Sequence, residues 1–284
     1  MITTLLAAAV ALGMAQQPVD TTVAMRAGER VHLEAVGGSA SFATWDREAV
    51  RVRSSHPPGM RVSVRPADGG VRVEAAGRAG APASAVRYEI TVPRNASISV
   101  NGVNLSVTVD GTTGSVAISN VEGVIHVRGV TGRVNVESVA GGLVVDNVTG
   151  DVAAATVNQS IRIGRVRGDI SAETVNGSIT VTGADAADVR ASTVNGMIEY
   201  DGAVRDDGRY FLGAHNGRVT MTIPDNANAR VRISSRTGRV EAAFPVSLSP
   251  ARNNRFEFTV GSGSADIELH SFNGAIRLIR PGGR

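Results

Sequence analysis

Seven consecutive nine-residue blocks between residues 121 and 181 constrain the fold of this chain most strongly. Every block begins with Val, and the third position is Gly in all blocks except the one that carries Gln159. The fifth position is always apolar and the seventh is Val, Ile or Ala, whereas the sixth and eighth are mostly polar or small. This alternation is typical of a short half-buried strand, and Gly marks a turn with positive φ or close backbone approach. Each block therefore predicts one strand and one corner.

A second period sets the size of a coil. Thr-Val-Asn recurs at residues 156–158, 174–176 and 193–195, and Gly-Asp corners at 150–151 and 168–169 lie between. Alternating corners stack on their own kind only if a coil has an even number of strands, and two is the simplest. The sequence predicts an all-β parallel β-solenoid with about nine residues per strand and corner, about eighteen per coil and coils about 4.8 Å apart. The side chains expected to point inward are Val157, Ile161, Ile163, Val175, Ile179 and Val181.

The repeats divide the chain into three expected parts. Residues 1–15 form a signal peptide, 16–109 an irregular β N-terminal or capping part, and 110–284 the solenoid repeats with a C-terminal cap. Phe42 and Trp45 are expected to cap the N-terminal end, because a bare terminal coil exposes its core and its strand edges. The aromatic residues expected to form the C-terminal cap are Tyr210, Phe211, Phe244, Phe256, Phe258 and Phe272.

The first fifteen residues are an apolar run that ends in Gly13-Met14-Ala15, with small residues at both positions that determine cleavage. This pattern predicts a secretory signal peptide that is removed to leave Gln16 as the first residue, although Lys and Arg are missing from its start. The run is too short for a transmembrane span. We expect an exported protein, either periplasmic or at the cell surface.

The composition excludes several kinds of chemistry. The chain has no Cys, which removes disulfides, thiolate metal ligands and a lipoprotein anchor. All 29 basic residues are Arg, so lysine Schiff-base catalysis is impossible. The net charge is only +3 and aromatic residues make up 4%, without a basic block or stacking platform for nucleic acid.

Polar residues recur at one type of corner. This column contains Asn158, Asn176, Asn195 and Asn216. The favoured interpretation is a structural ladder, in which each Asn has a left-handed conformation and its amide bonds along the stack. Gly at position 176 would then be neutral and Val destabilising. The alternative is a row of donors and acceptors for a glycan.

Acidic residues recur at the opposite corner. Asp151, Asp169 and Asp188 would lie one strand spacing apart and repel one another. The nearby Arg residues expected to offset this repulsion are Arg165, Arg167 and Arg190. The alternative interpretation is a divalent cation held between these carboxylates.

The sequence assigns no catalytic or cofactor-binding residue. The five His residues, His32, His56, His126, His215 and His270, lack metal-ligand spacing, and nucleophile-elbow and phosphate-loop motifs are missing. The repeat places Glu137, Ala155 and Glu173 in one row. The two carboxylates would lie two coils apart, about 9.6 Å, which is the far limit of the separation between the catalytic carboxyl groups of an inverting glycosidase. A carbohydrate-active β-helix enzyme, either a polysaccharide lyase or a hydrolase, is therefore an alternative to a non-enzymatic protein.

Three stretches carry a family resemblance: the corner T-V-N-G-S-I alternating with V-x-G-D-V, Val92-Pro93, and the closing pattern G-S-G-S-A-D-I-E-L-x-S-F-N-G-A-I at residues 261–276. Over residues 19–278 the chain resembles a bacterial family of candidate adhesins of unknown function, although Ala140 and Gln159 depart from the corner pattern. The resemblance implies an exported, non-enzymatic adhesin or structural component of the cell envelope. Its implied partner is a glycan or an envelope protein; a periplasmic accessory or sensor scaffold is a further possibility.

Overall fold

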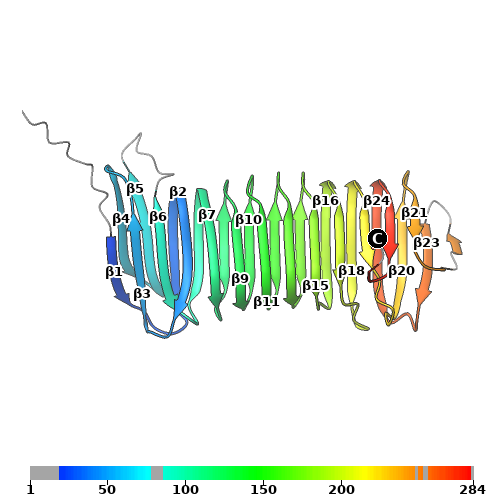
Figure 1. The fold of residues 1–284 in the computed structure, drawn as a ribbon, viewed down its shortest axis with the longest axis horizontal. Coiled ribbons are helices and arrows are strands. Elements are labelled where there is room, and N and C mark those ends of the chain that lie inside the picture. The colour runs from blue at the N-terminus through cyan, green and yellow to red at the C-terminus, as the bar shows by residue number, and fades with distance from the viewer. Residues whose placement is uncertain (1–18, 78–85, 247–248, 252–254, 283–284) are drawn as a thin grey trace, which may run out of the picture.

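The protein is an elongated stack of β-strands (Figure 1), described here from a computed structural model. The structure describes residues 19–77, 86–246, 249–251 and 255–282, so the expected signal peptide lies outside it. Within these residues 25 strands join one sheet and there is no helix. The predicted all-β, largely parallel solenoid is confirmed.

The regular coils contain two strands each. Strand β12 pairs in parallel with β10 on one side and β14 on the other, and Val152 lies beside Val134 and Ile170, a step of eighteen residues. The predicted coil length is confirmed. The strands of this region are β8 (Val116–Asn120), β9 (Ile125–Thr131), β10 (Val134–Ser138), β11 (Leu143–Thr149), β12 (Val152–Thr156), β13 (Ile161–Arg167), β14 (Ile170–Thr174), β15 (Ile179–Ala184), β16 (Asp188–Asn195) and β17 (Ile198–Gly202).

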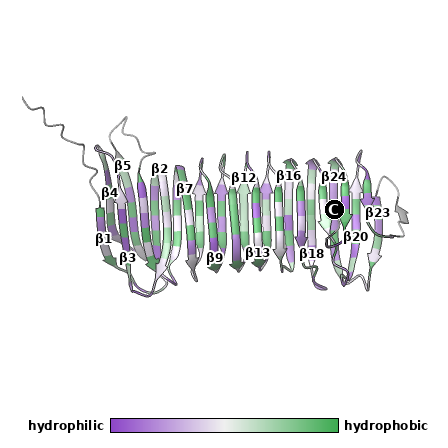
Figure 2. Ribbon diagram, in the orientation of Figure 1, coloured by the Kyte–Doolittle hydropathy of each residue, from purple (hydrophilic) through white to green (hydrophobic). Residues whose placement is uncertain are grey.

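The core is a column of aliphatic side chains inside the coils. Residues at the fifth and seventh block positions are buried in every coil, among them Ile161, Ile163, Ile179 and Val181, as predicted. The hydropathy colouring in Figure 2 shows hydrophobic and hydrophilic residues alternating along the strands. This alternation places one face of each strand in the core and the other in solvent.

The prediction that Val157 and Val175 point inward is wrong. These side chains are 38% and 40% exposed. The preceding Thr occupies the inward position instead: Thr156 is buried, and its Oγ1 donates a hydrogen bond to the carbonyl oxygen of Gly141. Since successive strand residues face opposite sides, the Val that follows this Thr faces outward.

The opposite corner has a different ninth residue. At these corners Gly129, Asn147, Arg165 and Gly183 have positive φ, including 54° for Asn147 and 49° for Arg165. A left-handed residue interrupts the two-residue alternation, so the Val that follows it turns inward. Val148 and Val166 are accordingly buried. The ninth block position therefore decides which Val residues enter the core.

Glycine is required at both corners, but its backbone conformation differs between them. Gly168 has φ of 142°, a conformation that L side chains rarely adopt. Gly177 does not have positive φ, but a Cβ there would lie 2.0 Å from the carbonyl oxygen of Gln159 in the adjacent coil. A Cβ at Gly168 would also lie 2.4 Å from the carbonyl oxygen of Gly150, so close approach is common to both corners and positive φ is added at Gly168.

Two long strands begin the solenoid. Strands β2 (Arg30–Trp45) and β7 (Ser97–Thr112) each pass along both sides of a coil and pair with each other in parallel. The boundary expected at residue 109 falls inside β7, which also pairs with β8 and β9. The outer strands are β1 (Val19–Ala24), β3 (Ala49–Ser55), β4 (Met60–Ala67), β5 (Gly70–Gly77) and β6 (Arg87–Pro93).

Antiparallel strands cover the N-terminal end: β4 pairs with β5, β3 with β6, and β1 with β3. Phe42, expected in this cap, is instead a buried core residue of β2 and lies beside Ile90 and Val109. Trp45 ends β2 half-buried, with Nε1 donating to the carbonyl oxygen of Ala49.

The C-terminal coils do not stack in chain order. The strands are β18 (Arg209–Asn216), β19 (Val219–Thr222), β20 (Ala229–Ser235), β21 (Val240–Ala242), β22 (Ser249–Ala251), β23 (Arg255–Val260), β24 (Ala265–Asn273) and β25 (Ile276–Ile279). Strand β24 inserts between β18 and β20 and is parallel to both, and β23 covers the far side of β20 as an antiparallel strand. Figure 1 shows the C-terminus inside the stack, on the solenoid side of β23.

Truncation of Ile161 tests the placement of the core. Ile161→Ala is expected to lower the free energy of unfolding by about 2–4 kcal/mol because it leaves a cavity. Val157→Ala, at an exposed corner of the same coil, should cost less than about 1 kcal/mol. Urea denaturation of both variants measures the difference, and equal losses would contradict the assignment of the two faces.

Candidate functional site

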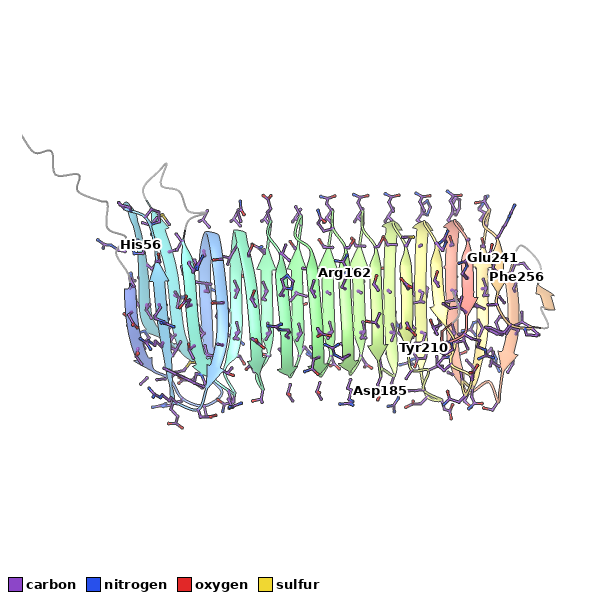
Figure 3. All side chains as sticks on the ribbon, in the orientation of Figure 1. His56, Arg162, Asp185, Tyr210, Glu241 and Phe256 are labelled. Carbon is purple, nitrogen blue, oxygen red and sulfur yellow. The ribbon has the colours of Figure 1, made fainter. Side chains whose placement is uncertain are left out.

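A groove of about 900 Å³ lies on the outer surface near the C-terminal end. It runs over β16, β18, β24, β20 and β23. Its lining residues are Ser192, Phe211, Gly213, Ala214, His215, Ser234, Ser235, Arg236, Arg255, His270, Ser271 and Phe272. Figure 3 labels Tyr210 and Phe256, which neighbour this region.

One outward row of side chains runs along the groove. The strand register places its members side by side in the order Ser192, Gly213, His270, Ser234 and Arg255. With strands about 4.8 Å apart, this row is roughly 19 Å long. The groove is thus long enough for an extended or oligomeric ligand.

Gly213 creates the hollow in which the ring of Phe211 lies. Phe211 is 37% exposed, and a Cβ at Gly213 would lie only 3.0 Å from its ring. The ring therefore lies along its own strand, with its centroid 5.5 Å from that of His270 on β24. A side chain at position 213 would displace this ring.

A stack of three side chains forms the corner wall. The rings of His215 and Phe272 are 4.7 Å apart and nearly parallel, at 12°, and the guanidinium of Arg236 lies 5.2 Å from the centre of the Phe272 ring. These residues follow one another on neighbouring strands. Phe272 is 39% exposed, and because His215 and Arg236 lie against its two faces, the edge of its ring is what reaches the surface.

The lining is basic. It contains Arg236 and Arg255, and none of its residues is Asp or Glu. Glu268, which is not among the lining residues, has its Oε1 2.8 Å from Nε2 of His270. Arg255 forms no ion pair with another residue of the described ranges. The groove therefore carries positive charge without a lining carboxylate to balance it.

A buried tyrosine anchors the strand that carries Phe211. The hydroxyl of Tyr210 accepts a hydrogen bond from the Arg205 backbone N–H at 2.8 Å and donates one to the carbonyl oxygen of Ala186 at 2.9 Å. Burial raises the pKa of Tyr210 above its ordinary value, so the hydroxyl stays protonated at neutral pH. This anchor fixes the start of β18 beneath the groove.

Sequence analysis did not identify this site. His215 and His270 are far apart in the chain and become neighbours of the two phenylalanines only because β24 inserts beside β18. Phe211 and Phe272, expected in the cap, are instead exposed in the groove. One usable signal was available: Phe211 lies between Tyr210 and Leu212, which occupy inward positions, so its ring must face outward.

The Asn column is hydrogen-bonded from coil to coil. Each Nδ2 donates to the Oδ1 of the preceding coil: Asn176 to Asn158 at 3.1 Å, Asn195 to Asn176 at 2.8 Å, and Asn216 to Asn195 at 2.9 Å. Asn273 continues the row with a bond to Asn216, and Thr237 donates to Asn273. The expected left-handed conformation is wrong, because none of these Asn residues has positive φ. Their position along the stack, and not a strained backbone, aligns the amides.

The Asp column also bonds along the stack, but to the backbone. Asp151 accepts the N–H of Asp169 at 3.3 Å, and Asp169 accepts the N–H of Asp188 at 3.0 Å. The Arg residues that balance the column are Arg133, Arg190 and Arg209. Of the three Arg residues expected there, only Arg190 contacts the column; Arg165 pairs with Asp146.

The two glutamates considered as a catalytic pair remain two coils apart. Glu137 and Glu173 lie in one outward row with Ala155 between them, as the repeat predicts. Within the described part of the chain, no three His, Cys, Asp or Glu side chains form a group suited to a metal ion. The same residues include no helix that could cross a membrane.

Removal of one amide tests the Asn ladder. Asn176→Gly breaks two amide bonds and should reduce the free energy of unfolding by about 1–2 kcal/mol, contrary to the neutral effect expected for a left-handed residue. Asn104→Gly is the control, because Asn104 lies in the same column of corners beside Glu122 and makes no amide bond to it. Thermal denaturation compares the two, and equal melting temperatures would show that the ladder contributes nothing.

Three solved structures match this chain over 93% of its length. They are a candidate adhesin from Bacteroides fragilis (12% identity, 93% of this chain and 98% of that chain, TM-score 0.40), one from Parabacteroides distasonis (10%, 93% and 98%, 0.36) and a candidate cell adhesion protein from Clostridium sporogenes (10%, 93% and 100%, 0.26). At these values the likeness carries no information about a ligand.

The family is shown by the sequence itself. A comparison with curated proteins gives no significant match. The sequence profile of the Toastrack DUF4097 family, however, matches residues 86–278, which span the solenoid from β6 to β25 and include the groove. The chain therefore belongs to the Toastrack DUF4097 family.

Proposed function

We propose that this chain is an exported, non-enzymatic adhesive protein of the cell envelope that binds a glycan in the C-terminal groove. The observation that carries the proposal is the pair of exposed aromatic rings, Phe211 and Phe272, held on adjacent strands of a rigid stack. Contiguous exposed apolar side chains mark interaction sites, and aromatic side chains dominate the energetics of interfaces.

The groove offers the groups that a sugar requires. The apolar face of a pyranose ring packs against an aromatic ring, and its hydroxyls need donors and acceptors around the edge. Phe211 supplies a ring face and Phe272 the exposed edge of its stacked ring, while Ser192, Ser234 and the imidazoles supply hydrogen-bonding groups. All of these side chains project from strands or strand ends, so binding requires little ordering of the protein.

The chemistry of the lining supports binding over hydrolysis. Glycoside hydrolysis commonly uses two carboxyl groups on either side of the scissile bond, one of them as an acid. The groove presents guanidinium, imidazole and hydroxyl groups at its surface. A polysaccharide lyase or hydrolase is the alternative, and a turnover assay on every bound glycan distinguishes it from an adhesin.

Export is part of this proposal and rests on the apolar run that ends at Ala15. Intact-mass measurement of the protein from its native host should show a mature chain that begins at Gln16. The measurement should be made on both the cell-associated and the released fractions. A full-length protein confined to the cytoplasm would contradict export.

Binding by the groove is tested with an array of glycans and envelope components. Phe272→Ala should weaken binding of a captured glycan by roughly tenfold, because it removes the exposed ring edge and the stack that positions His215 and Arg236. Val175→Ala removes a side chain of similar exposure outside the groove and should leave binding unchanged. Equal affinities for the two variants would place the ligand elsewhere on the solenoid.

A further inference from the structure

We propose that the groove selects an acidic glycan, whose sugar ring lies on Phe211 beside the edge of Phe272 and whose negatively charged substituent meets Arg236 and Arg255. This inference rests on the proposed glycan-binding function and adds the charge of the ligand. It follows from the arrangement of the cations and of the surrounding carboxylates.

The two Arg residues lie at the same end of the groove. Arg255 on β23 is the register partner of Ser234, and Arg236 follows Ser235 directly after the end of β20. Both side chains are exposed. Ser192 and Phe211 lie on β16 and β18, toward the regular coils. The groove therefore has a cationic end and an uncharged end, which gives a bound ligand a direction.

Carboxylates near this end are already paired. Glu268 contacts His270 at 2.8 Å, Glu257 lies 3.8 Å from Arg230, and Asp266 lies 3.6 Å from Arg232. The two Arg pairs join neighbouring strands, whereas Glu268 and His270 lie on the same strand. Arg255 has no such pair among the residues that the structure describes. An anion that enters the groove consequently meets Arg255 without displacing a carboxylate of the described residues from it.

Arginine suits this role because its planar guanidinium donates two parallel hydrogen bonds to a carboxylate or a sulfate. Arg236 also covers one face of the Phe272 ring, so its guanidinium is held beside the exposed edge of that ring, next to the sugar. A charged substituent close to a pyranose ring, as in a uronic acid or a sulfated sugar, would meet both features together. An uncharged sugar would use only the rings and hydroxyls.

The test measures binding to matched acidic and neutral ligands by calorimetry. The probes are an oligogalacturonate, its methyl ester and a sulfated oligosaccharide, each titrated into the protein that begins at Gln16. The acid or the sulfated sugar should bind at least tenfold more tightly than the methyl ester, and this advantage should diminish with added salt. Which of the two binds more tightly identifies the anionic group.

Arg255→Gln should remove most of the advantage of the acidic ligand and leave the methyl ester unaffected. The control is Arg162→Gln, which makes the same charge change at an exposed residue that Figure 3 shows in the middle of the stack, away from Phe256. Melting curves should be the same for both variants, because both side chains are exposed.

The outcomes separate this inference from the function on which it rests. If the methyl ester bound as tightly as the acidic ligands and its binding depended on Phe272, the acidic preference would be overturned and glycan binding would remain. Equal effects of Arg255→Gln and Arg162→Gln would show general attraction to a basic protein and would also overturn it. Failure of every array glycan to bind in a Phe272-dependent manner would overturn both proposals.

Discussion

The structure depends on backbone pairing between coils that repeat with nearly the same length. Parallel strands pair in register only if equivalent residues return to the same height, and a step of eighteen residues achieves this from β8 to β15. Each inward residue then packs on its counterpart in the next coil, and polar corner residues align with their counterparts. The buried core, the Asn ladder and the Asp column all follow from this one constraint.

The same constraint explains why the groove lies where the repeat becomes irregular. In the regular coils, outward rows carry short or charged side chains, such as Asn135, Ala153 and Ser171, on strands of equal spacing. Near the C-terminus, longer connections allow the chain to turn back toward earlier coils, and β24 pairs between β18 and β20. This insertion brings rings and cations from distant segments onto neighbouring strands. Rigid coils beneath them hold the surface in place.

Much of the fold was predictable because its signals are local and periodic. The alternation at the fifth and seventh block positions predicts strands, and the two corner types predict a two-strand coil. Val157 and Val175 show the limit of this reasoning. A single nine-residue frame treats all first-position Val residues alike, whereas the ninth residue, either a buried Thr156 or a left-handed Arg165, decides which Val faces the core.

The sequence by itself determined the strand period, the coil length and the alignment of Asn and Asp into columns, because these depend on spacing along the chain. Only the tertiary structure decided the order of the last coils and the groove that this order creates. Phe272 lies beside His215, and His270 beside Gly213, through pairing between segments far apart in sequence. No local pattern encodes that neighbourhood, because the energy that selects it comes from closing the end of the core with β20 and β23.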